Sequence, residues 1–370
     1  MRSYKPYIIK LCIVFLCFWG WILTGSAQKV GTNDYFYVLN TQQGLSDNCI
    51  LQMIQLADGR LAVRTRKGIN LYNGRRFTFI PLPAEKAESI TKYKGQTHLY
   101  ADSQDRLWVK EYQKIFCILL SEGRLQEHSL DSLPGNGKEN KMRIIPNTPT
   151  GNAIQDLFVD SRKNVWVVMG DSLLNTQDGN LIHLKKEWGY LQDLDTDGKQ
   201  VYAFMDSGIV AVFQKDKLVY AASAYSTAEA QHYRNTSLTI QTLSGQFYQI
   251  RTGRGEKNKA DASIFLHFNP ETRKFARIFA CDYILHTLNM SSDNQALISS
   301  QHGYLMFDFK LGTTPREVRE LSLPDGKSLT TGINTVYRDK EGAIWLGTYH
   351  NGLIYVSPML GLFFTIDQTW

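Results

Sequence analysis

Two histidines stand at corresponding places in the last two units of a repeating pattern, and their type and spacing could support chemistry. His302 and His350 are 48 residues apart, and a pair of imidazoles on one face could transfer protons or share a metal ion. Such a mechanism needs a nearby carboxylate, but neither segment holds a His-x-Glu pair, and Glu341 is expected on the opposite side. There is also no Gly-x-Ser-x-Gly elbow and no phosphate-binding loop. We therefore predict no catalytic residue, no metal site and no cofactor; the alternative is a lyase or hydrolase that uses this histidine pair.

Basic and aromatic side chains recur in the same kind of segment, and their chemistry suits a ligand. Arginine forms paired hydrogen bonds with carboxylate or sulfate groups, and an aromatic ring offers a flat face to a sugar ring. The candidates are Arg64, Arg66, Lys110, Tyr112, Arg251, His302, Tyr349 and His350. We predict that they bind an oligosaccharide with acidic groups; the alternative for each of them is a solvated turn residue.

These segments are positioned by a strand pattern that is clearest in residues 332–358. Alternating runs at 333–337, 343–348 and 353–356 are separated by two polar turns, and Trp345 lies at the centre of the second run. Turn residues between short β-branched and aromatic runs predict antiparallel strands. Because one such module cannot bury both of its faces, further copies of it are expected in the chain.

Six further copies appear when an apolar anchor residue is aligned with Trp345. The anchors are Ala62, Trp108, Trp166, Tyr202, Tyr248, Leu297 and Trp345, at intervals of 46, 58, 36, 46, 49 and 48 residues. A period of about 40 to 50 residues built from short strands is typical of a β-propeller. We therefore predict an all-β fold over residues 28–358: a seven-bladed β-propeller of four-stranded antiparallel blades, in which the aromatic anchors are buried within the blade sheets.

The strands of each blade can be ordered by analogy with other propellers. Strand A precedes the polar turn and lines the central channel, the anchor strand is B, and strands C and D follow outward. The B–C and D–A loops then open on one face, and loops on a rigid scaffold commonly carry binding residues. Two longer inserts, residues 131–152 and 252–261, are expected in such loops and could cover a ligand.

Ring closure is the next question, because a propeller must pair its first and last strands or leave an open edge. Residues 35–38 and 362–366 compete for the outer strand of the seventh blade. Residues 35–54 have the same layout as residues 318–337, an outer strand, a polar loop and then an inner strand. We therefore predict that the amino-terminal segment closes the ring, and that the apolar tail at 359–370 leads toward a following domain.

The amino terminus, residues 1–27, predicts a signal peptide. Arg2, Lys5 and Lys10 precede an apolar stretch at 11–23 and a small-residue cleavage site. Thirteen apolar residues are few for a bilayer span, so we expect the signal peptide to be cleaved. The alternative is that it stays uncleaved as a membrane anchor. Removing the three cations lowers the formal net charge from +6 to +3, which argues against a nucleic-acid partner. The mature chain is expected in the periplasm.

The seventh repeat resembles a known family. Its sequence RDKEGAIWLGTYHNGLIYV, residues 338–356, resembles the two-component regulator propeller repeat, and residues 35–77 resemble the start of periplasmic sensors of hybrid two-component systems from Bacteroides-type bacteria. The middle repeats depart from the pattern because they lack the Gly-Thr after the aromatic anchor. In the family, such propellers bind breakdown products of complex polysaccharides and signal through further domains to a histidine kinase.

The resemblance implies a ligand-sensing propeller of a two-component signalling system that is not itself an enzyme. Its expected partners are an oligosaccharide and a histidine kinase. The kinase is expected either on a continuation of this chain or on a partner chain. The protein could also form a homodimer. The alternatives are a propeller lyase or hydrolase, or a propeller that binds a partner protein.

Overall fold

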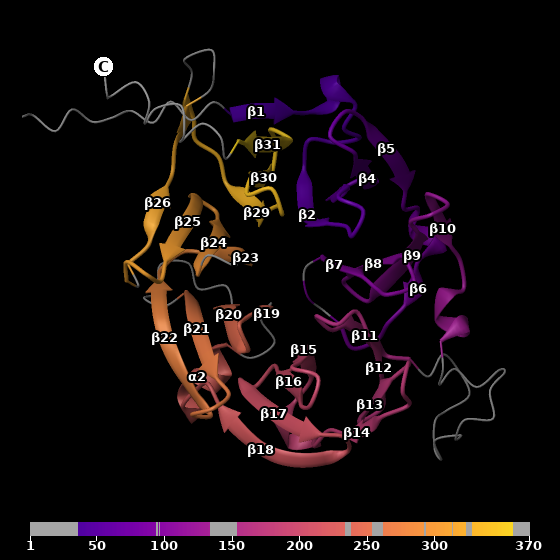
Figure 1. The fold of residues 1–370 in the computed structure, drawn as a ribbon, viewed down its shortest axis with the longest axis vertical. Helices are drawn as coiled ribbons and strands as arrows, with labels where there is room; N and C mark the ends of the chain where they lie inside the picture. Colours follow the sequence, from indigo (N-terminus) through magenta and orange to yellow (C-terminus); the bar gives the residue numbers. More distant parts are fainter. Residues whose placement is uncertain are drawn as a thin grey trace, which may run out of the picture. The chain divides into compact units, whose positions relative to one another are not determined.

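Seven antiparallel sheets form from short runs of β-branched and aromatic residues that alternate with polar turns. The computed structural model describes residues 36–93, 95, 97–133, 154–233, 238–253, 262–291, 294–312, 314–322 and 328–357. The predicted signal peptide at 1–27 and the tail at 359–370 lie outside these residues, as do most of the two long inserts. Figure 1 shows the sheets arranged around one axis, with the predicted strand A of each sheet nearest to the centre.

The blades follow one another in chain order, each with four strands from the inside outward. Blades one to three consist of β2 (Ile50–Gln55), β3 (Leu61–Thr65), β4 (Gly68–Tyr72) and β5 (Phe77–Pro81); β7 (His98–Ala101), β8 (Arg106–Glu111), β9 (Lys114–Leu119) and β10 (Arg124–Gln126); and β11 (Asp156–Val159), β12 (Val165–Met169), β13 (Ser172–Asn175) and β14 (Leu181–His183). Blades four to six consist of β15 (Leu191–Thr196), β16 (Val201–Met205), β17 (Ile209–Gln214) and β18 (Lys217–Ser223); β19 (Leu238–Leu243), β20 (Gln246–Thr252), β21 (Ser263–Asn269) and β22 (Lys274–Cys281); and β23 (Leu285–Ser291), β24 (Gln295–Ser300), β25 (Gly303–Asp308) and β26 (Arg316–Val318). The predicted seven-bladed propeller is confirmed.

The seventh blade joins the two ends of the ring. It contains β29 (Ile333–Arg338), β30 (Ile344–Thr348) and β31 (Leu353–Val356), and its outer strand is β1 (Phe36–Leu39). The register pairs Phe36 with Val356 and Leu39 with Leu353. The prediction that the amino-terminal segment closes the ring is therefore confirmed.

Few other elements accompany the blades in the described residues. They are β6 (Glu88–Ser89), which pairs with β9; the two-stranded sheet of β27 (Leu321–Ser322) and β28 (Ser328–Leu329); the short helix α2 (Thr227–His232); and the 3-10 turns η1 (Thr41–Gln43), η2 (Ala84–Lys86), η3 (Ser129–Ser132) and η4 (Lys186–Trp188). Among these residues, no helix has the length and apolar character needed to cross a membrane.

The hydrophobic core is divided among the seven interfaces between neighbouring blades. Each interface has its own cluster of buried side chains, because both faces of every inner sheet must be covered. Trp108 packs with Leu157 between blades two and three, and Trp345 packs with Ile50 between blades seven and one. The ring is thus stabilised at every interface by apolar burial.

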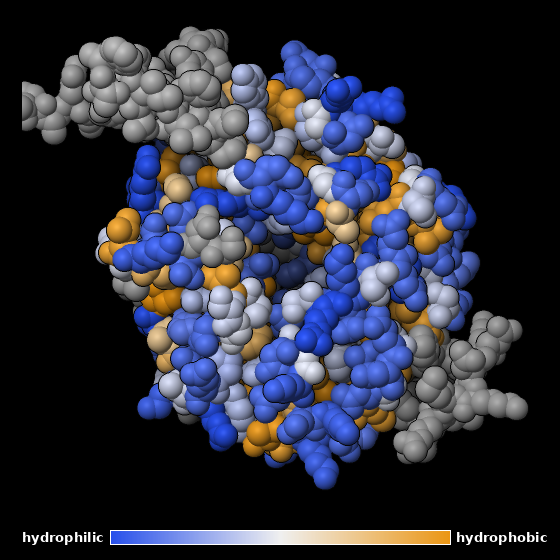
Figure 2. All heavy atoms as spheres, viewed as in Figure 1, coloured by the Kyte–Doolittle hydropathy of each residue, from blue (hydrophilic) through white to orange (hydrophobic). Residues whose placement is uncertain are grey.

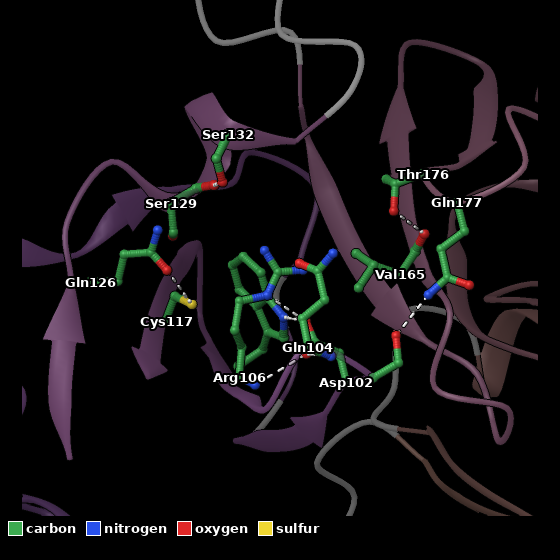
Figure 3. Close-up of polar contacts among 12 residues, drawn as sticks. Asp102, Gln104, Arg106, Cys117, Gln126, Ser129, Ser132, Val165, Thr176 and Gln177 are labelled. Atoms are coloured by element: carbon green, nitrogen blue, oxygen red, sulfur yellow. Dashed lines mark hydrogen bonds and ion pairs between the residues drawn. The ribbon is translucent and has the colours of Figure 1, made fainter. Parts of the chain in front are cut away.

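Three of the predicted anchors form hydrogen bonds with the polar turns that precede them. In blades two, three and seven, the Nε1–H of Trp108, Trp166 and Trp345 donates to the carboxylate six residues earlier, at 2.7 to 2.9 Å. Figure 3 shows the turn of blade two, where Arg106 also donates to Asp102. The three tryptophans are at most 8% exposed, as expected. Tyr202 is also buried, whereas Tyr248 is half-buried.

Candidate functional site

The inner strands surround a central channel. A cavity of about 280 Å³ is lined by residues from all seven A strands, from β2 to β29. Figure 2 shows the hollow at the centre of the ring, with many hydrophilic residues around it. Because the inner edge of each A strand has no strand partner, the channel wall offers backbone polar groups as well as side chains.

Three of the predicted ligand-binding residues lie between blades rather than in exposed loops. Arg64, Lys110 and Arg251 are at most 5% exposed. Arg64 of β3 makes paired hydrogen bonds to Glu111 of β8, with its Nη2 2.8 Å from Oε1. These side chains are still part of strand B, because β3, β8 and β20 run further than the sequence pattern indicated.

Lys110 is fully buried between blades two and three, where polar and aromatic groups surround its ammonium group. Its Nζ donates to Asp156 Oδ1 at 3.0 Å and to the carbonyl oxygen of Leu157 at 2.9 Å. It also lies 3.6 Å from the ring centroid of Phe158 and 4.3 Å from that of Tyr93. Burial lowers the pKa of Lys110, and the neighbouring Asp156 opposes that effect. Lys110 therefore links blades two and three through an ion pair and a hydrogen bond to the backbone.

Arg251 joins blades four and five. Its Nη2 donates to the carbonyl oxygen of Met205 at 2.9 Å, and its Nε donates to Gln249 Oε1 at 3.1 Å. Its Nη1 is buried and has no hydrogen-bond partner within the described residues. Arg251 therefore has a structural role between blades, and one of its donors is not used there.

The exposed candidates separate into one group and two single residues. Burial raises the pKa of Cys49 and the nearby Arg66 opposes this effect, while burial and the nearby Cys49 raise the pKa of Tyr349. The Tyr349 and His350 rings lie 6.2 Å apart. We call Arg66, Tyr349 and His350 the loop-face group, because all three lie in B–C loops of blades one and seven. The structure therefore places Arg66 of blade one and Tyr349 of blade seven near Cys49, with His350 next to Tyr349.

Among the described residues, the side chains of Tyr112 and His302 form no ring contact or hydrogen bond with the loop-face group. Tyr112 is 64% exposed in the B–C loop of blade two. His302 is exposed in the B–C loop of blade six, where its ring lies 5.3 Å from that of Tyr283. His302 and His350 are thus on corresponding loops, each beside a tyrosine, and neither hydrogen-bonds a carboxylate among the described residues.

His286 is a neighbour of the loop-face group that the sequence pattern did not reveal. Its ring lies 6.1 Å from that of Tyr349 in an edge-to-face arrangement. Its Nε2 is buried without a partner in the described part of the chain. Burial lowers the pKa of His286 to about 4, so the imidazole is neutral near neutral pH. A neutral imidazole can both donate and accept hydrogen bonds.

The channel wall contains further polar groups that sequence analysis did not single out. Asp193 of β15 is 8% exposed and lines the channel with His98 and Tyr100 of β7. Burial raises the pKa of Asp193 to about 7, although Lys110 opposes the effect. Burial also lowers the pKa of His98 to about 3, with a further contribution from Lys110. This wall therefore holds a neutral imidazole beside a carboxyl group that titrates near neutrality.

The raised pKa of Asp193 predicts that the fold loses stability as the pH rises through neutrality. A carboxyl group that binds its proton more tightly in the folded state stabilises fully below its unfolded pKa, and this contribution is lost as the pH passes the folded value of about 7. The difference is equivalent to roughly 4 kcal/mol at most. In thermal denaturation from mildly acidic to mildly alkaline pH, the wild type should therefore lose more stability than Asp193→Asn. Equal pH dependence in the two proteins would contradict this prediction.

The carboxyl-terminal repeat has a recognisable family pattern. Residues 328–350 match the two component regulator propeller. The resemblance predicted from the sequence is therefore confirmed for the seventh blade, where the Gly-Thr after the anchor is present. A comparison with curated proteins gives no match.

Solved structures with a similar fold include extracellular domains of two component systems and a lyase. The extracellular domain of the hybrid two component system BT3049 from B. thetaiotaomicron is 16% identical, with a TM-score of 0.56 over 87% of this chain and 42% of that chain. The corresponding domain of BT4673 from the same organism is 12% identical, with a TM-score of 0.54 over 87% and 40%. A streptogramin B lyase is 11% identical, with a TM-score of 0.53 over 87% and 97%. This chain thus spans about two fifths of the length of the two extracellular domains, and at these identities the similarity is one of fold.

Proposed function

We propose that the chain is a ligand-sensing propeller of a two-component signalling system, located outside the cytoplasm in the periplasm. The observation that carries this proposal is the two component regulator propeller match at residues 328–350. The similarity in fold to extracellular domains of hybrid two component systems supports it. A regulator propeller fits a non-catalytic sensor, so the phosphorylation step is assigned to a histidine kinase, on a continuation of this chain or on a partner chain.

The ligand in this proposal is an oligosaccharide that binds at the loop-face group. Arg66 supplies a guanidinium group for a carboxylate or sulfate, and Tyr349 supplies a partly exposed ring. His350 is exposed beside Tyr349, and His286 adds an unused polar atom next to the same ring. Arg64, Lys110 and Arg251 are left out of the site because the structure buries them between blades.

The ligand site is tested by calorimetry of the full chain against acidic and neutral glycan fragments of host and plant origin. We expect an acidic fragment to bind, and the double variant Arg66→Ala/Tyr349→Ala to weaken its binding at least about tenfold, because a charged hydrogen bond and a stacking surface are both lost. The control is Phe79→Ala, which removes an exposed aromatic ring from outer strand β5. Unchanged affinity in the double variant would exclude this site, and binding of no fragment in the panel would exclude an oligosaccharide ligand.

A further inference from the structure

The wall of the central channel differs between its two sides, because the inner strands use their polar side chains differently. On the side of β23 and β29, these side chains bond to the neighbouring blade. Asn289 Oδ1 accepts a hydrogen bond from the backbone N–H of Arg338 at 2.9 Å, and Thr287 Oγ1 accepts one from the N–H of Val336 at 3.1 Å. These groups hold blades six and seven together, so they are already used within the fold.

On the side of β7 and β15, polar atoms remain unused. Within the described residues, the Asp193 carboxylate accepts one hydrogen bond, from the N–H of Leu194 at 2.9 Å. The Tyr100 hydroxyl is buried and has no partner there. The His98 ring stacks on Tyr100 with 5.8 Å between centroids and 15° between planes. Buried polar groups normally have partners, so a nearly buried carboxylate with an unused oxygen on a cavity wall points to a ligand.

The charge of the lining indicates the kind of ligand. Asp160, Asp193 and Asp195 line the channel, and no lysine or arginine does so among the described residues. Asp160 and Asp195 each accept hydrogen bonds on both oxygens and have a structural role. Lys110 lies behind the wall and is bonded to Asp156. Asp193 is therefore a nearly buried carboxylate that has no cation of its own in the described structure, which favours a cationic ligand.

We propose that the central channel binds a small ligand through a protonated primary amine, with Asp193 as its counter-ion. The amine donates to the Asp193 carboxylate, and His98 and Tyr100, which line the same cavity, lie beside the ligand's carbon atoms. A cavity of about 280 Å³ is at the small end of ligand pockets and suits a monosaccharide or a short amine. The described residues contain no group of three or more His, Cys, Asp or Glu able to hold a metal ion, so an organic cation fits better.

The test is calorimetry of the full chain near neutral pH with glucosamine, N-acetylglucosamine and butylamine. Glucosamine should bind, and N-acetylglucosamine should bind at least about tenfold more weakly, because acetylation removes the charge that pairs with Asp193. The butylamine result shows whether the sugar ring contributes to binding. If butylamine binds as tightly as glucosamine, the ligand is a simple amine; if it binds more weakly, the ligand is an amino sugar. Equal affinity for the two sugars, or binding of neither glucosamine nor butylamine, would overturn the proposal.

One variant and two controls make the test specific to this wall. Asp193→Asn keeps the shape of the side chain and should weaken amine binding at least about tenfold. Tyr100→Phe removes a buried hydroxyl that is not exposed to the channel and has no partner in the described protein, so it should leave amine binding unchanged. Asp216→Asn, in an exposed loop of blade four, makes the same charge change and should leave binding unchanged. Unchanged affinity in Asp193→Asn would overturn the proposal, and the loop-face variants test the proposed function separately.

Discussion

Deleting residues 36–39 is expected to leave the protein unfolded or aggregated. This segment is β1, and without it the seventh blade loses its outer strand and β31 exposes an unpaired edge. The deletion also removes Phe36 from the cluster between blades six and seven. Circular dichroism and size-exclusion chromatography would detect the loss. A monomer that melts at the wild-type temperature would contradict the assigned closure.

A matched pair of point variants tests whether β1 stabilises the fold through its buried side chain or only through its pairing with β31. Phe36 is 3% exposed, whereas its neighbour Tyr37 is 60% exposed on the same strand. Phe36→Ala should lower the free energy of unfolding by about 3 to 5 kcal/mol. Tyr37→Ala should change it by only about 0.5 kcal/mol. Similar losses in the two variants would show that β1 contributes little through its buried face.

The second large effect is expected at the buried tryptophan of blade two. Trp108→Ala removes the largest side chain of the cluster between blades two and three and leaves Asp102 without one of its donors. We expect the free energy of unfolding to fall by about 3 to 5 kcal/mol in denaturant titration. Trp108→Phe keeps most of the apolar volume, so it should lose less.

The control for Trp108 is another aromatic residue of the same blade. Tyr112 is 64% exposed, and Tyr112→Ala should change stability by about 0.5 kcal/mol or less. If Trp108→Ala were as mild as Tyr112→Ala, the anchor would not be a core residue, and the interblade cluster would not depend on it.

Blade number and ring closure were predictable because they depend on patterns that repeat along the chain. Trp108, Trp166 and Trp345 are each preceded by an aspartate at the same distance, and this combination marks a turn and the strand after it. The closing strand was predictable because residues 35–54 repeat the layout of residues 318–337. Both signals are local, so they do not require knowledge of which blades touch.

The burial of the basic residues was not predictable in the same way, because their partners are distant in sequence. Lys110 was predicted in the B–C loop that follows the anchor strand of blade two. Its partner Asp156 lies on the next blade, and only the packed ring brings the two together. A weak signal was available: Arg64 and Lys110 each stand two residues after an anchor position, and both pair with the following blade.

The channel residues were missed for a different reason. Asp193 and Asp195 alternate along an inner strand, where aspartate is unfavourable, and this departure from strand preference was the available signal. Their separate roles depend on partners in other blades: Asp195 accepts from Ser161 of blade three, whereas Asp193 remains largely unused. A repeat pattern describes what the blades share, so it does not identify the features that distinguish one blade from another.

The closing strand pair also determines how the ring would respond to mechanical force. Phe36 and Val356 face each other, so the chain enters and leaves the ring at the same end of the β1–β31 ladder. In an antiparallel ladder the hydrogen bonds run across the strands, so a pull on these two connections would separate them one after another. Such unzipping requires less force than shearing all the bonds at once. Tension applied through the chain would therefore open the seventh blade first, and the sheets of the other six blades, each formed by one continuous segment, would not carry the load.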